Sequence, residues 1–181
     1  MTTTAEAPAP VVSGAVLFTD LVGFTEFTAS QGDEGAVELL GRQEQIVEAV
    51  LPEGSRVVKE LGDGLLLWFP DADSALSTAL DLQQGFEEVA AETGLPLWVR
   101  MGLHWGQQTR RRDDLVGHDV NVAARIVDVA GPGEVLLSDA TRVALVRASP
   151  DVCFDELGPV VMKGIPDPIP LYRAWRGERT P

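Results

Sequence analysis

The segment VVKELGDGLLLWF, residues 57–69, constrains the fold more than any other, because two apolar runs meet there at a very short turn. Residues 55–61 and 65–70 have the composition of β-strands, and Gly62-Asp63-Gly64 between them is typical of a tight turn. The segment therefore predicts a β-hairpin. Lys59 and Asp63 are charged residues within this otherwise apolar hairpin, so their presence needs an explanation other than burial.

Strands and helices alternate along the rest of the chain. Apolar runs and alternation predict further strands over 11–19, 97–103, 134–138, 152–162 and 169–175. Apolar residues at helical spacing predict helices over 33–51, from Asp71 onward, over 119–130 and over 139–147. Ser138 or Asp139 is a suitable cap for the last helix. This order predicts an α+β sheet with its helices packed on one side.

The polar stretch QQTRRRDD, residues 107–114, interrupts the pattern and predicts a loop or an extended arm. We expect one domain over residues 11–176, between a flexible tail at 1–10 and a short tail at 177–181. The first ten residues have neither the basic nor the apolar region of a secretory signal.

Charge and composition exclude several classes of partner. A formal net charge of −14 argues against binding to nucleic acid or to an anionic membrane surface. No apolar run approaches the roughly 20 residues of a membrane-spanning helix. Cys153 is the single cysteine, so an intrachain disulfide is impossible, which is consistent with a cytoplasmic location.

Residues 16–25, VLFTDLVGFT, predict a strand that ends at Asp20, followed by a glycine-containing turn into a helix. Asp20 and Asp63 then lie at the ends of strands that can be neighbours. Grouped carboxylates suit hard cations such as Mg²⁺ or Mn²⁺. The unpaired N–H groups of a helix start, here residues 22–25, suit an anion. Together these features predict a triphosphate site.

Residues 113–126, DDLVGHDVNVAARI, place a second polar group on a helix. Asn121 and Arg125 are four positions apart and share a face, which lies away from the apolar stripe of Ala123 and Val127. A neighbouring amide and guanidinium are suited to recognising a ribose and a phosphate.

Five segments in this order resemble the catalytic domain of class III nucleotidyl cyclases: FTDLVGFT, KELGDG, GLHWG, DLVGHDVNVAARI and LGPVVMKG. The resemblance extends from about residue 12 to about residue 175. It implies a ferredoxin-like βαββαβ core with additional C-terminal β/α elements. It also implies a head-to-tail homodimer whose active sites lie at the interface between the two chains.

The resemblance assigns phosphate and metal roles to individual residues. Asp20 and Asp63 match the two aspartates that bind the metal ions, and Leu21 would contribute its backbone carbonyl. Lys163 matches a lysine that reaches the distal phosphates. The positions that hold the triphosphate are matched by Gly23, Phe24 and Thr25.

The resemblance also implies residues that read the base and the ribose. Lys59 and Asp114 match the base-reading pair, while Asn121 and Arg125 match residues that orient the ribose and stabilise the transition state. A lysine can donate to adenine N1, and an aspartate can accept from the adenine amino group. Guanine presents the opposite pattern, and guanylyl cyclases typically have a glutamate in place of Lys59. The expected reaction is therefore conversion of ATP into 3′,5′-cyclic AMP and pyrophosphate with two divalent ions.

Simpler explanations exist for each residue taken alone. Asp20 can cap a helix, Asp63 can fill a turn, and Lys59 can be a solvated charge on an edge strand. Asn121 and Arg125 can form an ordinary solvated helix face. A non-catalytic ATP-binding regulatory module of the same fold is the alternative function.

Two further choices remain open from the sequence. Asp113 competes with Asp114 as the base reader, and the spacing to Asn121 favours Asp114. His104 and His118 are interpreted as structural residues and not as metal ligands, because two histidines without a cluster of other ligands make a weak site.

Overall fold

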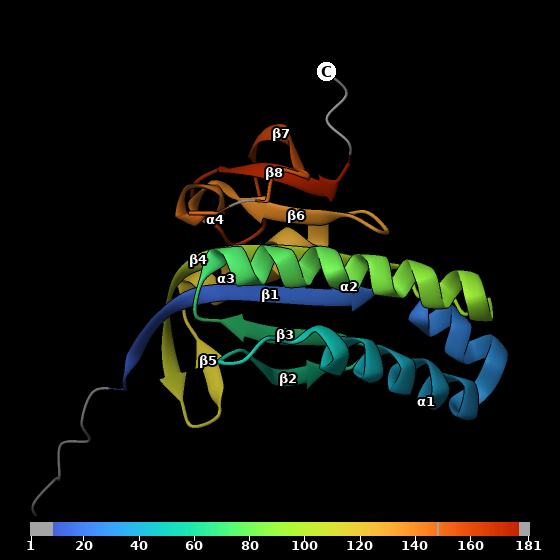
Figure 1. Ribbon diagram of the computed structural model, residues 1–181. Helices are drawn as coiled ribbons and strands as arrows, with labels where there is room; N and C mark the ends of the chain where they lie inside the picture. The colour runs from blue at the N-terminus through green and yellow to red at the C-terminus, as the bar shows by residue number, and fades with distance from the viewer. Residues whose placement is uncertain (1–8, 148, 178–181) are drawn as a thin grey trace, which may run out of the picture.

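The computed structural model describes residues 9–147 and 149–177 (Figure 1). The first half of this part contains β1 (Val11–Leu21), α1 (Phe24–Val50), β2 (Arg56–Leu61), β3 (Gly64–Phe69) and α2 (Ala72–Thr93). The second half contains β4 (Val99–Arg111), β5 (Asp114–Val116), α3 (His118–Val129), β6 (Val135–Ser138), α4 (Asp139–Ala144), β7 (Val152–Val160) and β8 (Ile169–Arg176). The predicted tails lie almost wholly outside the described residues.

The strands form a single sheet in the order β2-β3-β1-β4-β6-β8-β7, and β5 pairs with β4 outside this path. Strand β1 is antiparallel to both β3 and β4, while β4 is parallel to β6. The first four strands along the chain, with α1 and α2, have the order of a ferredoxin-like fold. This confirms the predicted α+β class, and β6, α4, β7 and β8 are the additional C-terminal elements.

The helices do not all pack on one side of the sheet, so that part of the prediction is wrong. Leu17 belongs to a core cluster with α1 and α2, whereas its neighbour Val16 belongs to a cluster with α3. Neighbouring strand residues point to opposite faces, so α3 covers the face opposite α1 and α2. The apolar stripe of a helix shows that the helix is buried on one side, but it does not show which face of a sheet it covers.

The predicted elements are otherwise present, with changed boundaries. Helix α1 starts at Phe24, well before the predicted start, and Gly32 interrupts it with a backbone φ of 76°. This kink explains why the apolar spacing emerged only after it. Residues 107–111 continue β4, and Thr109, Arg110 and Arg111 pair with β5, so the polar stretch is an extended hairpin. Ser138, and not Asp139, caps α4, because its side chain accepts from the N–H of Thr141.

Most of the buried side chains lie between the sheet and the layer of α1 and α2. Figure 1 shows α2 running across β1, and this layer encloses the large apolar cluster that contains Phe69, Phe86 and Met101. In the described residues, no helix is sufficiently long and apolar to cross a lipid bilayer.

Candidate active site

A β-bulge determines where the side chain of Lys59 points. In the β2–β3 ladder Val57 is opposite Leu67, but Lys59 is opposite Leu66, so the register shifts at the residue between them. Leu66 packs in the cluster beneath α3. Without the bulge, Lys59 would be opposite Leu65 and would point to the other face. The bulge therefore turns Lys59 toward the face that carries α3.

On that face Lys59 meets Asp114, the first residue of β5. The Nζ of Lys59 is 2.8 Å from Oδ2 of Asp114, and both side chains are more than one-third exposed. The hydrogen bond from Lys59 is the main cause that lowers the pKa of Asp114, with further help from the N–H of Leu115. The backbone carbonyl of Asp113 accepts from Arg56 instead. The structure thus brings the carboxylate of Asp114 to Lys59.

Asp20 and Asp63 lie at adjacent strand ends, as the sequence predicts. Asp20 is the penultimate residue of β1, and Asp63 is in the turn that joins β2 to β3. Burial raises the pKa of Asp63, and the negative charge of Asp20 raises it further, while a backbone hydrogen bond and Arg100 act in the opposite direction. The two carboxylates are therefore close enough to repel one another, which is an arrangement that a divalent cation would stabilise.

These two carboxylates are the acidic groups available to a cation at this place. Within residues 9–147 and 149–177, no group of three or more His, Cys, Asp or Glu side chains has the arrangement of a metal site. Two carboxylates with neighbouring backbone carbonyls fit Mg²⁺ or Mn²⁺, since Mg²⁺ is commonly bound by one or two carboxylates together with substrate phosphates. The donor set thus fits an ion that arrives with a nucleotide.

Arg100 is a site residue that the sequence reasoning missed. It lies directly opposite Asp20 in the β1–β4 ladder, and its Nε is 2.7 Å from Oδ2 of Asp20. Its Nη1 donates to the backbone carbonyl of Asp128 in α3 at 3.3 Å. A signal was present in the sequence: Val99 and Met101 alternate as buried residues, so Arg100 between them must point to the other face.

Helix α1 begins beside Asp20 without a side-chain cap. Gly23 is its N-cap with φ 80°, and the N–H of Phe27 donates to the carbonyl of Gly23 at 2.9 Å. The N–H groups of the first turn, which include those of Phe24 and Thr25, precede this bond and have no helical partner. They are available to an anion. The prediction of free N–H groups over residues 22–25 is wrong for Val22, because its N–H donates to the carbonyl of Trp98 at 2.8 Å.

Asn121 and Arg125 lie on the outward face of α3, as their spacing predicts. Both residues are exposed, whereas Val122 and Ile126 beside them are buried. Nη1 of Arg125 is 2.7 Å from Oδ2 of Asp128, an exposed pair one turn apart.

Lys163 lies in the segment between β7 and β8, next to α3. Met162 and Ile165, on either side of it, pack in one cluster with residues of α3. Lys163 itself is exposed. Asn121, Arg125 and Lys163 are therefore carried by neighbouring segments, and they point away from the core of the chain.

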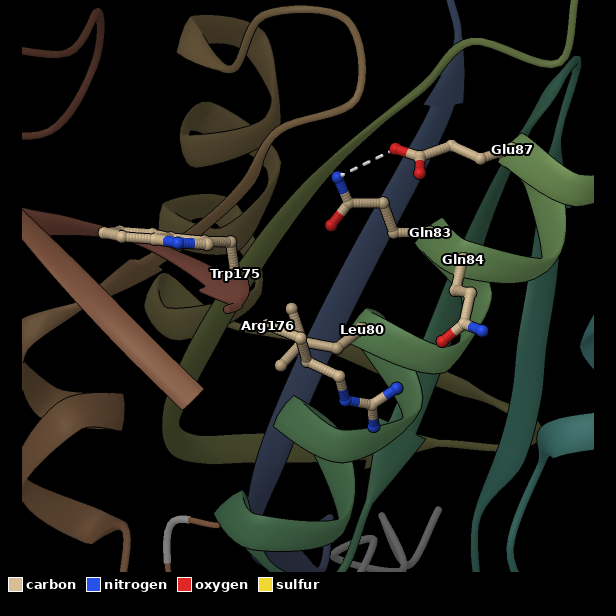
Figure 2. A pocket seen from close by; sticks show the side chains of 6 residues that line it. All are labelled: Leu80, Gln83, Gln84, Glu87, Trp175 and Arg176. Carbon is tan, nitrogen blue, oxygen red and sulfur yellow. Dashed lines mark hydrogen bonds between the residues drawn. The ribbon is translucent and has the colours of Figure 1, made fainter. Parts of the chain in front are cut away.

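A cavity of about 350 Å³ lies elsewhere, between α2 and the end of β8 (Figure 2). It is lined by Leu80, Gln83, Gln84, Glu87, Trp175 and Arg176. None of these is a predicted site residue. Figure 2 shows Trp175 on one side of the cavity and the polar side chains of α2 on the other. The cavity is thus separate from the candidate active site.

The family model of the adenylate and guanylate cyclase catalytic domain matches residues 8–173 of this chain. This chain belongs to that family. It is 34% identical over 164 residues to a pH-sensitive adenylate cyclase of Mycobacterium tuberculosis, covering 90% of this chain and 40% of the relative. It is 37% identical over 134 residues to an adenylate cyclase of Streptomyces coelicolor, covering 74% of this chain and 34% of the relative.

A solved structure has the same fold. The adenylyl cyclase CyaB from P. aeruginosa superposes with a TM-score of 0.84 at 23% identity, over 94% of this chain and 97% of that one. This chain spans less than half the length of each of the two curated relatives described above, from M. tuberculosis and S. coelicolor. The family includes enzymes for both purine nucleotides, so the substrate has to be argued from the residues of this chain.

Proposed function

We propose that this cyclase domain converts ATP into 3′,5′-cyclic AMP and pyrophosphate in active sites shared between two copies of the chain. The observation that carries the proposal is the contact between Lys59 and Asp114. It places one hydrogen-bond donor and one acceptor side by side on the face that carries α3. The curated relatives named as adenylate cyclases support the same activity.

The order of donor and acceptor favours adenine. The ammonium group of Lys59 can donate to adenine N1, and the carboxylate of Asp114 can accept from the exocyclic amino group. Guanine has an N–H at position 1 and an oxygen at position 6, so each protein group would face a like partner. A polar group that is desolvated without a partner costs about 1–3 kcal/mol, so two mismatches give strong discrimination.

Asp20 and Asp63 would hold two divalent ions, with the carbonyl of Leu21 as a further ligand. When bound, such ions lower the pKa of the ribose 3′-hydroxyl and neutralise negative charge on the triphosphate. The first-turn N–H groups of α1, from Gly23 to Thr25, would bind phosphate oxygens. Arg100, which already holds one oxygen of Asp20, keeps that carboxylate in a fixed orientation.

The proposed reaction depends mainly on the positions of the reacting 3′-oxygen and α-phosphate. The 3′-oxygen loses its proton and attacks the α-phosphorus, and the bond from that phosphorus to the bridging oxygen of pyrophosphate breaks. Asn121 would orient the ribose, and Arg125 would stabilise negative charge that develops on the α-phosphate. Lys163 would neutralise the departing pyrophosphate. No covalent intermediate with the protein is required.

The directions of these groups support the proposal that two chains share each site. Asp20 and Asp63 lie at one end of the central strands, whereas Asn121 and Arg125 point outward from α3. A head-to-tail dimer would bring the outward face of α3 in one chain to the carboxylates of the other. Because each chain carries both sets of residues, a homodimer would contain two equivalent sites.

The direct test is incubation of the purified chain with ATP or GTP and Mn²⁺, followed by measurement of cyclic nucleotide and pyrophosphate. The proposal predicts cyclic AMP from ATP and far less cyclic GMP from GTP. Tight ATP binding with no product would support a non-catalytic module, and preferential formation of cyclic GMP would contradict the assignment of the Lys59–Asp114 pair.

A further inference from the structure

The segment GLHWG on β4 forms the surface on which α3 rests. Gly102, His104 and Gly106 alternate, and they are opposite Phe18, Val16 and Gly14 of β1 in the ladder. Val16 and Phe18 belong to the cluster under α3, so the three β4 residues face the helix as well.

The two glycines allow α3 to approach the strand closely. A Cβ at Gly102 would overlap the backbone nitrogen of Val127, and a Cβ at Gly106 would overlap the carboxylate of Asp119. Gly102 therefore allows the end of α3 to approach β4, and Gly106 allows its first turn to do so. His104, between them, is the polar member of this surface.

His104 is only 6% exposed, and both of its ring nitrogens have partners. Nδ1 is 2.7 Å from the hydroxyl of Ser138 at the end of β6, and Nε2 is 3.4 Å from Oδ1 of Asp119 in α3. The other oxygen of Asp119 accepts from the N–H of Gln107 at 2.6 Å. This chain of contacts ties β6, β4 and the first turn of α3 together.

The partners of the two ring nitrogens of His104 indicate which nitrogen carries the proton. The hydroxyl of Thr141 lies within hydrogen-bonding distance of the carbonyl of Leu103 and of the hydroxyl of Ser138, and its single hydrogen can go to either one. The Ser138 hydroxyl accepts from the N–H of Thr141, and its own hydrogen can point to Nδ1 of His104. A carboxylate only accepts, so Nε2 of His104 must carry the hydrogen that faces Asp119.

The contacts of Asp119 with His104 and with the N–H of Gln107 are polar anchors at the start of α3. The N-cap is Gly117, with φ 140° and no side chain to cap the helix. Apolar contacts between α3 and the sheet are non-directional, so they resist a small shift along the helix axis less than a directional hydrogen bond does. Asp119 lies two residues before Asn121 and six before Arg125, so a shift of the first turn would move both.

We propose that His104 and Asp119 are positioning residues for the cyclase reaction: their contact fixes the position and rotation of α3 and thereby aims Asn121 and Arg125. This inference rests on the proposed function for those two residues. Neither His104 nor Asp119 touches the substrate in this scheme. Loss of their contact would displace Asn121 and Arg125, so it should mainly lower the rate of the chemical step.

The titration of the imidazole agrees with this arrangement. Burial is the main cause that lowers the pKa of His104 from its ordinary value of 6.5, and the charge of His118 lowers it further. Asp119 acts in the opposite direction, by its charge and by the hydrogen bond. The imidazole is therefore neutral near pH 7, with one donor and one acceptor for its two partners.

The first test reads the proton directly by NMR. The chain has two histidines, so His118→Gln leaves His104 as the single imidazole signal in protein labelled with ¹⁵N-histidine. We expect a neutral ring at pH 7 with the proton on Nε2, and a pKa of His104 below 6.5. A proton on Nδ1, or a ring that is charged at neutral pH, would overturn it. This measurement needs no enzyme activity.

The second test uses kinetics with a matched control. His104→Phe keeps a ring of similar size but cannot bond to Asp119, so we expect kcat to fall about 10- to 100-fold with KM for ATP nearly unchanged. His104→Gln should recover part of kcat, because its amide can donate to Asp119. His118→Phe is the control, since His118 is exposed at the start of the same helix.

The outcomes separate this inference from the proposed function. A wild-type chain without any cyclase activity would contradict the proposed function, while the NMR test would still decide whether His104 donates to Asp119. A folded His104→Phe variant with the kcat of the wild type would overturn the positioning role. If His104→Phe does not fold, Asp119→Ala removes the partner and keeps the imidazole, and a folded Asp119→Ala variant with the kcat of the wild type would overturn it equally.

Discussion

Lys59 and Asp114 lie 55 positions apart in the sequence, yet Nζ of the first is 2.8 Å from Oδ2 of the second. The contact exists because a bulge in β2 turns Lys59 to the α3 face and because the β4–β5 hairpin brings Asp114 back along the sheet. The same two groups have the hydrogen-bonding pattern that complements adenine. The proposed choice of substrate thus depends on a pair whose geometry is set by the fold.

Reversal of this pair should change the preferred nucleotide. In a Lys59→Glu/Asp114→Asn variant, a carboxylate can accept from the guanine N–H and an amide can donate to the guanine oxygen. We expect kcat/KM for ATP to fall by about 100-fold or more and the ratio of GTP to ATP turnover to rise. Cyclic AMP and cyclic GMP would be measured in parallel.

Glu60→Gln is a suitable control for that experiment, because Glu60 is exposed and adjacent to Lys59 in the same strand. It removes a charge without touching the pair, so it should leave the nucleotide preference unchanged. If the double variant keeps the preference of the wild type for ATP, the base is not read by these residues.

Loss of either acidic residue at the strand ends should abolish metal binding at the site. Asp20→Asn and Asp63→Asn each leave a single carboxylate, so Mn²⁺ affinity in the presence of a non-hydrolysable ATP analogue should fall by more than the roughly 10- to 100-fold expected for an outer-shell partner. Electron paramagnetic resonance of free Mn²⁺ measures this without turnover. Asp33→Asn, an exposed residue in α1, should bind Mn²⁺ like the wild type.

The close approach of α3 to β4 should make Gly102 sensitive to a single methyl group. We expect Gly102→Ala to lower the free energy of unfolding by about 1–3 kcal/mol or more, because the added carbon overlaps the α3 backbone. Gly41→Ala, in α1, has open space around it and should be neutral or stabilising by up to about 1 kcal/mol. Urea unfolding of both variants compares them directly, and equal effects would contradict the packing described.

Stability should fall as the solution becomes acidic, in part because of His104. Its pKa in the folded chain lies below the unfolded value of 6.5, so the unfolded state binds more protons below that pH. The contribution of His104 is complete above the unfolded pKa and is lost as the pH falls through it toward the folded pKa. The free energy of unfolding should therefore decrease less between pH 7.5 and about 5.5 in His104→Gln than in the wild type.

His118→Gln provides the comparison for that measurement, since it removes the exposed histidine and leaves the buried one. It should keep a pH dependence close to that of the wild type. A pH dependence that is lost in His118→Gln and kept in His104→Gln would show that the buried imidazole is not the group responsible.

The sequence predicted the class of fold and nearly all of the elements, because periodicity and turn residues are local properties. It did not predict the face covered by α3, which depends on Gly102 and Gly106 and their fit to a helix far along the chain. The bulge that turns Lys59 toward α3 could not be predicted either, since a shift of register is visible only when β2 is paired with β3.

Candidates for the site could also be chosen from the sequence, and their roles stay predictions. Positions at strand ends indicated Asp20 and Asp63, and helical spacing indicated Asn121 and Arg125. The structure places the carboxylate of Asp114 at Lys59. Arg100 was not selected, because the alternation around it predicts only the face to which it points and does not predict its contact with Asp20, 80 positions away. The partners of His104 could be seen only in three dimensions.

The claim that two chains share each active site is tested most directly by mixing two inactive variants. Asp20→Ala removes a proposed metal ligand, and Arg125→Ala removes the proposed transition-state arginine, so each homodimer should be inactive. Equal mixing should restore about one quarter of wild-type cyclic AMP formation, because about half of the dimers are mixed and each contains one intact site. Activity of the mixture that only equals the sum of the two separate variants, with both folded and dimeric, would contradict the account.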